Sequence, residues 1–561
     1  MRTWKILINP KKNKRNAAFC RYFQANTADA KCMYNTANFY IRNTMTGLRK
    51  SPEERTHSEI EVLHYVFTGI QKANAELWKV HLKQIQKLPA NDGMPNMKRA
   101  TKAYFLSCET LEYPTEKKWF LSYTTLDAIF KFTNNPVYKR MNSQVNQNAI
   151  RKATQAWMGY FKALKGYAEE PWKYQAKPKI PGYQKSSEYI AWFTSQVAKL
   201  KEQDGTYYLQ FVNCKDWLPV GKKSVYAGLK YVKTEVRPEY GRYSVLLTFD
   251  DKAKTIPVPK NPKRILGLDP GVGNFLGVAN NFGQTPFVIK GGALKSANRR
   301  FNKKHAALMS SLTKGKDSSH STKYSEQLNI LSRKRSSFFR DYFYKCAWYL
   351  CRYAVAAGVE VFVMGHNQNQ KQEISLGDVV NQHFVSIPYT QFISILTVVA
   401  AKCNIAVVVR EESYTSQASL LDMDDIPTYK AGENQNYIFS GKRIHRGLYR
   451  SKNGTVMNAD INGAANIIRK EYPEAFASMK SLSYLYTTTL VIGYKDLYRN
   501  AKALRSRENR FHMAGIGSQV CHRYRKEDRT TYRILWGKGQ FVWKGKKKQS
   551  AESSLVEKQS A

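Results

Sequence analysis

The sequence predicts a multidomain α/β protein with a helical N-terminal domain, a small β-barrel and an α/β domain whose strands and helices follow a set order. Three observations support this prediction. At 561 residues the chain is too long for one ordinary domain, and about three domains are expected. Helical periodicity dominates as far as residue 170, and short β-rich runs then take over until about residue 260. Beyond them, strand and helix patterns alternate.

The charge of the chain indicates its partner. Lys and Arg number 90 against 43 Asp and Glu, which leaves a net charge of +47. Such an excess repels itself, and binding a polyanion relieves the repulsion. Nucleic acid is the expected partner, because 36 Tyr and 10 Trp residues lie among the charges and can stack on bases. A membrane surface is the weaker alternative, since no apolar run approaches ~20 residues and no signal peptide opens the chain.

The cysteines argue against both structural zinc and a disulfide framework. They are scattered, and no CxxC pair occurs. Zinc knuckles need closely paired cysteines, so no zinc is expected, and the pattern suits a reduced cytosol. The eight residues are Cys20, Cys32, Cys108, Cys214, Cys346, Cys351, Cys403 and Cys521.

The first 170 residues are predicted to hold one strand and several helices. Thr3–Ile8 is predicted to be a short strand. A basic loop follows, and helical spacing begins at Thr27. Further helical patterns cover Glu59–Lys87 and Thr125–Phe132. Residues 13–170 are therefore predicted to form a helical domain.

The clearest helical pattern runs from Ser143, a good N-cap residue, to Lys165. One face is apolar, and the opposite face carries a polar stripe at i, i+3, i+4 and i+7. Such a stripe is ordinarily a solvated face. Amide and guanidinium groups can also read adenine and guanine edges bidentately, so contact with DNA bases is the sharper hypothesis. The stripe consists of Gln144, Gln147, Asn148 and Arg151.

The Pro- and Lys-rich stretch Lys173–Lys185 marks a domain boundary. Four β-rich runs follow, and the first two join across Asp204-Gly205, a turn signal. We interpret residues 171–260 as a small β-barrel that ends in the stiff, Pro-rich linker Ile256–Pro262. The four runs are Val197–Leu200, Tyr207–Val212, Leu229–Val236 and Tyr243–Phe249.

The stretch Ile265–Ala279 organises the remainder of the chain. It is typical of a hairpin, because an apolar run ends at Asp269, a Pro-Gly-x-Gly turn follows and a second apolar run leaves the turn. Downstream patterns complete the order β-β-β-α-β-α-β-α of a ribonuclease H-like domain. In that arrangement the first, fourth and fifth strands lie side by side and parallel, so their carboxyl ends meet at one crevice. The later elements are predicted at Phe287–Ile289, about Thr322–Ala357, Glu360–Met364, Pro388–Cys403, Ile405–Arg410 and a helix that begins at Asp460.

Three motifs of this domain resemble the RuvC-type motifs of the TnpB family, which consists of transposon-encoded, RNA-guided DNA endonucleases related to type V CRISPR effectors and Fanzor proteins. Weaker matches upstream are Ala30–Asn35, the helix Ser143–Lys165 and Pro178–Tyr183. The resemblance implies that residues 1–12 supply the first strand of a wedge domain formed mainly by 171–260, that 13–170 are a recognition domain and that 261–475 are a RuvC-like nuclease domain. Residues 476–561 form a basic C-terminal extension outside the resemblance. The motifs are Gly267-Leu-Asp-Pro-Gly-Val-Gly-Asn-Phe-Leu276, Tyr414-Thr-Ser-Gln417 and Asn458-Ala-Asp-Ile-Asn-Gly-Ala-Ala-Asn-Ile467.

The chain departs from the family pattern in two places. Most members carry a four-cysteine zinc finger between the second and third motifs, but the corresponding interval, 417–457, contains no cysteine. We therefore call residues 417–457 the degenerate zinc-finger region. Most members also end the fourth strand with a Glu, where this chain has Met364-Gly365-His366.

The resemblance implies a guide RNA that pairs with target double-stranded DNA beside a short motif, and two-metal cleavage of the DNA. Asp269 and Asp460 would hold two Mg²⁺ (or Mn²⁺) ions, although Asp460 can also favour its helix N-terminus. Arg333 and Arg335 of the long helix would bind nucleic acid. The expected location is the cytoplasm, at the nucleoid when DNA is bound. Three alternatives stay open: a nuclease-inactive RNA-guided repressor, a compact type V CRISPR effector and a structural RNA-binding protein.

A third carboxylate is needed near the crevice. Glu360 lies at the wrong end of its strand, ~13 Å away, and Glu373 lies well past that strand. Glu411 and Glu412 follow the fifth strand, but periodicity sends them to opposite faces and does not choose between them. The resemblance does choose, because Fanzor proteins and some TnpB relatives carry a relocated Glu three residues before the Thr of the Thr-Ser motif. Counting back from Thr415 gives Glu412 as the expected third catalytic ligand.

Overall fold

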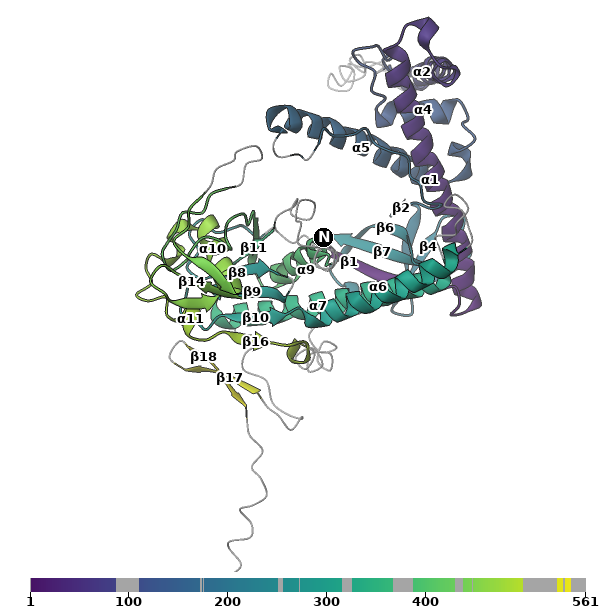
Figure 1. Ribbon diagram of the computed structural model, residues 1–561. Helices are drawn as coiled ribbons and strands as arrows, with labels where there is room; N and C mark the ends of the chain where they lie inside the picture. The colour runs from purple at the N-terminus through teal and green to yellow at the C-terminus, as the bar shows by residue number, and fades with distance from the viewer. Residues whose placement is uncertain are drawn as a thin grey trace, which may run out of the picture. The chain divides into compact units, whose positions relative to one another are not determined.

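The computed structural model divides into two compact units, Met1–Ala253 and Lys254–Ala561 (Figure 1). Among the residues it describes, no helix is long and apolar enough to cross a bilayer. The described residues are 2–86, 110–171, 174, 176–250, 256–271, 273–314, 325–366, 387–428, 437–445, 447–497, 532–537 and 540–545.

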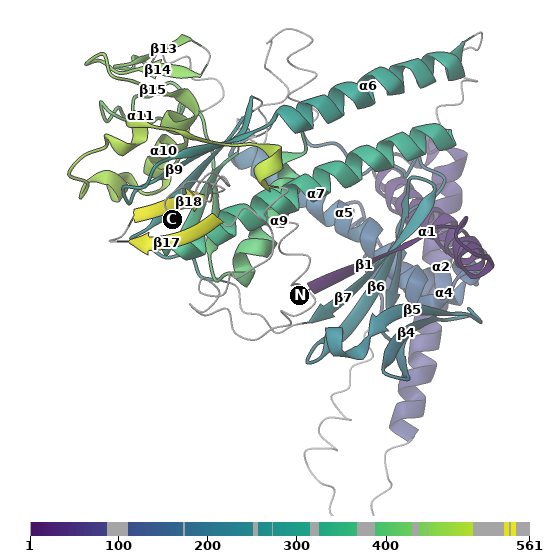
Figure 2. The same ribbon diagram turned by 90° about the horizontal axis from the view of Figure 1, so that it is seen from below.

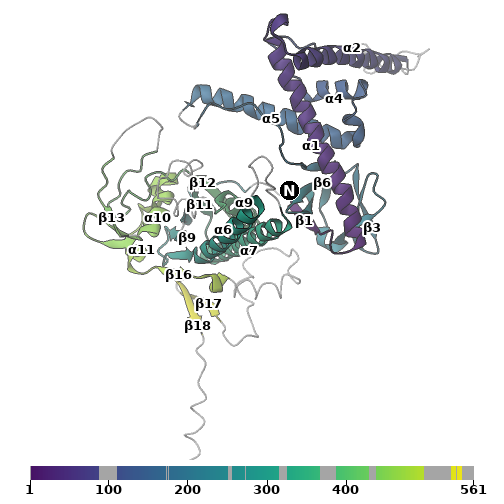
Figure 3. The ribbon, with the colours of Figure 1, turned by 45° about the vertical axis from the view of Figure 1, so that its right-hand side comes forward.

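The first unit is built on one long helix, α1 (Figure 3). Its first half packs with the strands of the unit through Phe19 and Phe23, and its second half packs with the other helices through Met33 and Ile41. A single helix therefore contributes to both the β core and the helical core. The helices are α1 Lys14–Leu48, α2 His57–Gln86, α4 Tyr123–Phe132 and α5 Ser143–Glu169, with 3₁₀ helices at Pro52–Glu54, Tyr138–Arg140 and Lys223–Tyr226.

The prediction of a basic loop before Thr27 was wrong, because α1 begins at Lys14. The side chain of Asn13 accepts a hydrogen bond from the backbone N–H of Asn16 at 2.7 Å and caps the helix. The many basic residues at this end make the helical pattern hard to recognise in the sequence. The buried Phe19 and Phe23, which lie one helical turn apart, belong to that pattern.

Helix α5 confirms the predicted helix, but its N-cap residue is Asn142 rather than Ser143. The Asn142 side chain accepts from the backbone N–H of Gln144 at 3.0 Å. The apolar face of α5 packs against α1, where the fully buried Trp157 donates from Nε1 to Asn38 Oδ1 at 2.8 Å. The polar face is consequently turned away from the helical core.

Helix α2 starts with a reciprocal cap between Thr56 and Glu59. The Thr56 N–H donates to Glu59 Oε2 at 2.8 Å, and the Glu59 N–H donates to Thr56 Oγ1 at 3.3 Å. Lys50 Nζ also contacts both carboxylate oxygens of Glu59 at 3.0 Å. Burial acts to raise the pKa of Glu59, but hydrogen bonds from Thr46, Thr56 and Lys50 outweigh it and lower the pKa to about 2.

The strands of the first unit form two sheets, where the sequence predicted one small β-barrel. The first sheet has the order β1-β7-β6-β2, and β1 pairs antiparallel with β7 along its whole length. The second has the order β3-β4-β5, and its β3–β4 turn lies at Asp204 and Gly205, both with positive φ. The inner faces of the two sheets pack into one shared hydrophobic core, which holds them together without a closed barrel.

All four predicted β-rich runs of this unit are strands, and two further strands, β2 and β5, were not predicted. Strand β2 is only four residues long, and β5 contains Pro219, which argues against a strand in the sequence. The strands are β1 Arg2–Ile8, β2 Ala191–Thr194, β3 Ala198–Gln203, β4 Thr206–Phe211, β5 Trp217–Lys222, β6 Lys230–Glu239 and β7 Arg242–Asp250.

The second unit contains a six-stranded sheet of order β12-β11-β8-β9-β10-β16. Strands β8, β11 and β12 are adjacent and parallel, as predicted for the first, fourth and fifth strands. The sixth strand, β16, was not predicted; it comes from beyond residue 475 and pairs in parallel with β10. The strands are β8 Ile265–Pro270, β9 Asn274–Asn280, β10 Phe287–Lys290, β11 Val361–Gly365, β12 Ala406–Arg410 and β16 Leu490–Ile492.

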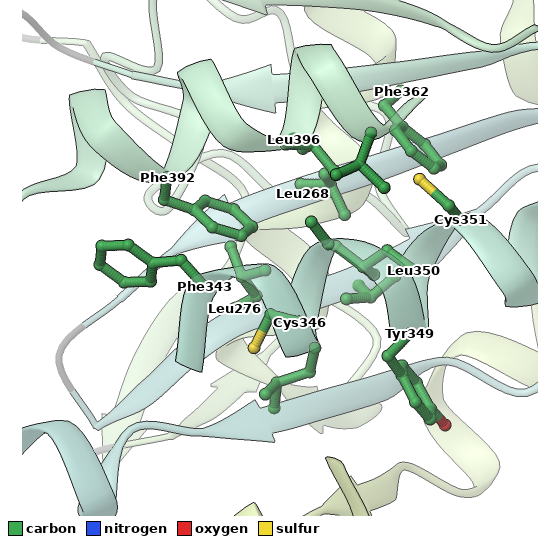
Figure 4. Packing of buried hydrophobic residues seen from close by; sticks show 14 of the residues in the cluster. Leu268, Leu276, Phe343, Cys346, Tyr349, Leu350, Cys351, Phe362, Phe392 and Leu396 are labelled. Carbon is green, nitrogen blue, oxygen red and sulfur yellow. The ribbon is translucent and has the colours of Figure 1, made fainter. Parts of the chain in front are cut away.

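Helices cover both faces of this sheet. Helices α7 and α9 bury one face, where Leu268 and Phe362 of the strands meet Phe392 and Leu396 (Figure 4). Helix α10 lies on the other face and has its own core cluster. Helices α6 and α7 run side by side (Figure 2). The helices are α6 Gly292–Thr313, α7 Glu326–Ala357, α9 Tyr389–Lys402, α10 Ala459–Glu471 and α11 Tyr484–Thr487, with a 3₁₀ helix at Pro473–Phe476.

The degenerate zinc-finger region folds around a small three-stranded sheet, β13-β14-β15. Tyr449, which is 1% exposed, donates from its hydroxyl to the Gln417 carbonyl at 2.7 Å. Asp424 Oδ2 accepts from the backbone N–H groups of Ser419 and Ser440 at 2.8 and 3.0 Å. Packing and hydrogen bonds therefore hold the described part of this region. The remaining strands are β13 Lys442–His445, β14 Leu448–Arg450, β15 Val456–Asn458, β17 Tyr532–Gly537 and β18 Gln540–Gly545.

Candidate active site

Three acidic residues that are far apart in the chain lie near the carboxyl ends of the parallel strands. Leu268 of β8 pairs with Met364 of β11, and Met364 pairs with Val409 of β12, so the three strands end almost level. Asp269 follows Leu268 directly, and Glu412 follows the end of β12 by two residues. Asp460 is the second residue of α10, the helix that crosses β8 and β9.

Three glycines let the backbones and carboxylates come this close. A Cβ atom at Gly463 of α10 would lie 2.5 Å from Asp269 Oδ2. A Cβ atom at Gly277 of β9 would lie 2.4 Å from the carbonyl oxygen of Asp460. A larger residue at Gly277 would therefore push the start of α10 away from the sheet, and one at Gly463 would displace either α10 or the carboxylate of Asp269.

The third glycine, Gly365, explains the absence of a carboxylate at the end of the fourth strand. A Cβ atom there would lie 2.7 Å from Glu412 Oε2 and 2.5 Å from Ile467 Cδ1. The carboxylate of Glu412 therefore occupies the space into which a side chain at position 365 would grow. A carboxylate reaches this spot from the neighbouring strand instead.

The structure separates the two acids that periodicity left open. Glu411 Oε2 accepts a hydrogen bond from Lys470 Nζ at 2.6 Å, and its Oε1 accepts from the backbone N–H of Ser413 at 2.6 Å. The Lys470 side chain is only 3% exposed. Glu411 is thus engaged in an ion pair with a buried ammonium group, and Glu412 is the acid whose charge acts on Asp269.

Electrostatic repulsion is concentrated on Asp269. The residue is half-buried, but its carboxyl group is surrounded by protein. This burial, with the nearby charges of Glu412 and Asp460, raises the pKa of Asp269 well above its ordinary value of 3.8. The positive charge of Arg443 in β13 acts in the opposite direction. A site that gathers negative charge in this way favours a cation.

Asp460 is held by neighbours that sequence reasoning missed. Asn274 Nδ2 donates to Asp460 Oδ2 at 2.5 Å and fixes its orientation. Asn458 is the N-cap of α10, because its side chain accepts from the backbone N–H groups of Asp460 and Ile461 at 2.9 and 3.4 Å. The cap is therefore supplied by Asn458, and the helix begins one residue before the predicted Asp460.

Two further neighbours of the site lie in stretches without a motif. The Tyr389 hydroxyl donates to the Gly271 carbonyl at 2.6 Å, and burial together with Asp269 and Glu412 raises the pKa of Tyr389. Arg443 is exposed and lies in the degenerate zinc-finger region. Only Asn274 had a signal in the sequence, since it belongs to the hairpin motif that carries Asp269.

The donor set suits a hard divalent cation. Among the described residues, no set of three or more His, Cys, Asp or Glu side chains is gathered closely enough to hold a metal ion in this conformation. Carboxylate oxygens are nevertheless the ligands that Mg²⁺ prefers, and a cation would offset the repulsion that raises the pKa of Asp269. Asp269, Glu412 and Asp460 are the residues that could hold it.

The predicted polar stripe of α5 is engaged within its own unit. Gln147 Nε2 donates to Asp127 Oδ2 at 3.1 Å, and the Arg151 guanidinium lies 4.6 Å from the ring centroid of Tyr123. Contact with DNA bases would require these groups to exchange partners. Hydrogen bonds within the unit also engage Gln144 and Asn148.

Arg335 has a structural contact that the sequence did not reveal. Its Nε donates to Asn298 Oδ1 at 2.7 Å, which ties α7 to α6, and its guanidinium lies 5.1 Å from the ring centroid of Phe301. Arg333 lies on the same helix and is partly buried. Glu360 lies at the far end of β11, where Oε1 accepts from the backbone of Lys263 at 2.9 Å.

Of the two acids that the sequence set aside, Glu373 lies outside the described residues. Glu360 lies at the opposite end of β11 from the site, so it does not compete with Glu412.

Two family models match the chain. The OrfB_IS605 model, described as a probable transposase, matches residues 232–370, and the Cas12f1-like TNB domain model matches residues 389–467. These matches contain Asp269, Glu412 and Asp460. No curated protein matches the chain.

Solved structures of RNA-guided effectors show a distant likeness. A Cas12f1–sgRNA–target DNA complex is 13% identical, with 72% of this chain and 82% of that chain covered and a TM-score of 0.40. A mini-RNA-guided endonuclease, CRISPR-Cas_phi3, is 10% identical, with 63% and 86% covered and a TM-score of 0.35.

Proposed function

We propose that this chain, whose resemblance to the TnpB family the two family models confirm, is an RNA-guided DNA endonuclease of a transposable element. One observation carries the proposal. Asp269, Glu412 and Asp460 come from three separate elements, and the charges of Glu412 and Asp460 act together on the Asp269 carboxyl. Such a concentration of negative charge destabilises a fold, so its presence points to a functional site.

The residues of the chain have distinct tasks in this reaction. When bound, two Mg²⁺ or Mn²⁺ ions supply an activated water and stabilise the leaving oxygen of the phosphodiester. Asp269, Glu412 and Asp460 would hold the ions, and Asn274 orients Asp460 through its hydrogen bond. The exposed Arg443 offsets part of the combined negative charge of the carboxylates and an incoming phosphate.

Guide RNA and target double-stranded DNA are the proposed partners. The net charge of +47 supports this assignment, because two polyanions are held at once. Arg333 and the α5 stripe are proposed to contribute to nucleic-acid binding, whereas the contacts of Arg335 already tie α6 to α7. The proposed location is the cytoplasm, at the nucleoid when DNA is bound, and no structural zinc is expected.

A compact type V CRISPR effector is the second candidate. The match of residues 389–467 to a Cas12f1-like domain favours it, and the two candidates share the same cleavage chemistry. A nuclease-inactive repressor is less well supported, because the acids, Asn274 and the three close-packed glycines all remain in place.

Plasmid cleavage tests the proposal. Protein purified with its bound RNA should cut a plasmid that carries the matching target when Mg²⁺ is present, and EDTA should stop the reaction. Asp269→Ala and Asp460→Ala should abolish cutting and leave RNA binding unchanged, because RNA binding depends on the excess of basic residues in the chain rather than on one carboxylate. Cutting in EDTA, or cutting by either variant, would refute the proposal.

A further inference from the structure

The first unit contains a cleft of about 500 Å³ that has no assigned role. It lies between α1, α5 and residues 178–184, and we call it the α1–α5 cleft. Ala156, Gly159 and Ala163 of α5 form one wall, and their small side chains leave that side open. Tyr183 and Lys179 line the opposite wall. A Cβ atom at Gly159 or Gly182 would meet no atom within 4 Å.

The wall formed by residues 178–184 is fixed in place. Asn35 Nδ2 donates to the Gln184 carbonyl at 3.1 Å, and its Oδ1 accepts from the Gln184 N–H at 2.8 Å. Asn38, which is fully buried, donates to the carbonyls of Pro181 and Gly182 at 3.2 Å. The cleft therefore exists before any ligand binds, which lowers the entropic cost of binding.

The chemistry of the cleft suits a base attached to a phosphate backbone. The Tyr183 ring is 42% exposed, although the segment around it is firmly held. The Arg42 guanidinium lies 5.0 Å from the Tyr183 ring centroid, and Lys179 is exposed at the cleft. An exposed ring beside two cations is the arrangement by which proteins stack single-stranded bases.

We propose that the α1–α5 cleft binds one unstacked nucleobase of a nucleic-acid strand, with Tyr183 as the stacking surface and Lys179 beside the backbone phosphate. The inference rests on the proposed function only for the origin of that strand, which is either the guide RNA or single-stranded target DNA. Holding one base would fix the position of the strand relative to α1 and α5.

Binding of a short fluorescent strand tests this inference separately from cleavage. The probe is a strand of about six nucleotides with a central 2-aminopurine, made once as RNA and once as DNA, and it is mixed with the full-length protein in EDTA. Stacking on Tyr183 quenches the 2-aminopurine fluorescence. Because no metal is present, failure of the proposed nuclease activity does not affect the result.

Two pairs of variants separate stacking from folding. Tyr183→Ala should remove the quenching and lower affinity about tenfold, whereas Tyr183→Phe should retain both. Gly159→Leu should fill the cleft and weaken binding as Tyr183→Ala does. Its unfolding temperature should be at least that of the wild type, because leucine favours a helix more than glycine does. Gly159→Ala is its matched control. Lys179→Ala should lower the salt dependence of binding, which Tyr183→Ala should leave unchanged.

Tyr240→Asn is the control for loss of an exposed ring elsewhere in the unit. Tyr240 is 38% exposed and has a φ of 50°, a conformation that asparagine tolerates. Its variant should bind as the wild type does. Stronger binding of the RNA or of the DNA probe identifies the origin of the base, and either supports the inference. Unchanged quenching in both Tyr183→Ala and Gly159→Leu, or an equal loss in Tyr240→Asn, would overturn it.

Discussion

Gly463 lies in the middle of α10 opposite Asp269, and its replacement by alanine is the smallest change that should disturb the candidate site. Helix propensity alone predicts that Gly463→Ala stabilises the protein by ~1 kcal/mol. The structure predicts otherwise. The new Cβ atom would lie 2.5 Å from Asp269 Oδ2 and 3.1 Å from its Cγ, and ordinary contact begins at 3.4 Å.

Either the carboxylate of Asp269 or the helix must therefore move by about 1 Å. Overpacking of this kind costs ~1–3 kcal/mol, which the gain in helix propensity partly offsets, so the net loss of stability should not exceed ~2 kcal/mol. Catalysis is far more sensitive to position. A displacement of about 1 Å at a reacting group can lower the rate ~100-fold, and cleavage by Gly463→Ala should fall by this order.

The assay measures cleavage of a matched plasmid and thermal unfolding on the same preparations. Gly292→Ala is the control, because Gly292 is also helical and a Cβ atom there would meet nothing within 4 Å. The control should cut at the wild-type rate. Gly463→Ala should remain folded, retain its RNA and cut slowly. If it cuts as fast as the control, Asp269 does not need the position that the structure gives it.

Three further predictions follow from contacts outside the three carboxylates. Glu411→Ala should lower the free energy of unfolding by ~1–3 kcal/mol, because the Lys470 ammonium would stay buried without its partner carboxylate. A denaturant titration measures this loss, and an unchanged midpoint would contradict the stabilising role of Glu411. The capping carboxylate of Glu59 has a pKa lowered from 4.5 to about 2, so its stabilisation is complete above pH 4.5 and is lost as the pH falls towards 2. The wild type should therefore be more stable than Glu59→Gln by ~1–2 kcal/mol at neutral pH, and this difference should vanish near pH 2. The difference is no larger because Lys50 is partly exposed. A difference that does not depend on pH would refute this role of Glu59. Gln147→Ala should relax preference at one position of the motif beside the target, at a cost of ~1–3 kcal/mol, and an unchanged preference in a library selection would leave the α5 stripe as a solvated face.

The sheet that carries the site could be predicted because its strands are signalled locally. Strands β8, β11 and β12 are short apolar runs bounded by polar or turn residues, and their adjacency follows from the order of elements. The start of α1 could not be predicted, since basic residues cover its helical pattern. Strand β16 was also missed, because its three residues form a strand only by pairing with the edge strand β10.

Side-chain direction at the site could not be predicted from periodicity. Glu411 and Glu412 follow the end of β12, where the backbone is no longer a regular strand, so alternation says nothing about which acid turns inward. Lys470, which holds Glu411, lies 59 residues further along the chain. Arg443 was missed for the same reason: its proximity to Asp269 arises from tertiary structure alone.

We propose that Glu412, and not its neighbour Glu411, completes a carboxylate site with Asp269 and Asp460. The most direct measurement compares Glu412→Gln with Glu411→Gln in Mg²⁺-dependent cleavage of a matched plasmid, with RNA binding and thermal unfolding recorded for both. We predict that Glu412→Gln loses cleavage while it keeps its RNA and its stability. Glu411→Gln should unfold at a lower temperature but still cut. Full activity of Glu412→Gln, or equal loss of activity in the two folded variants, would contradict the account.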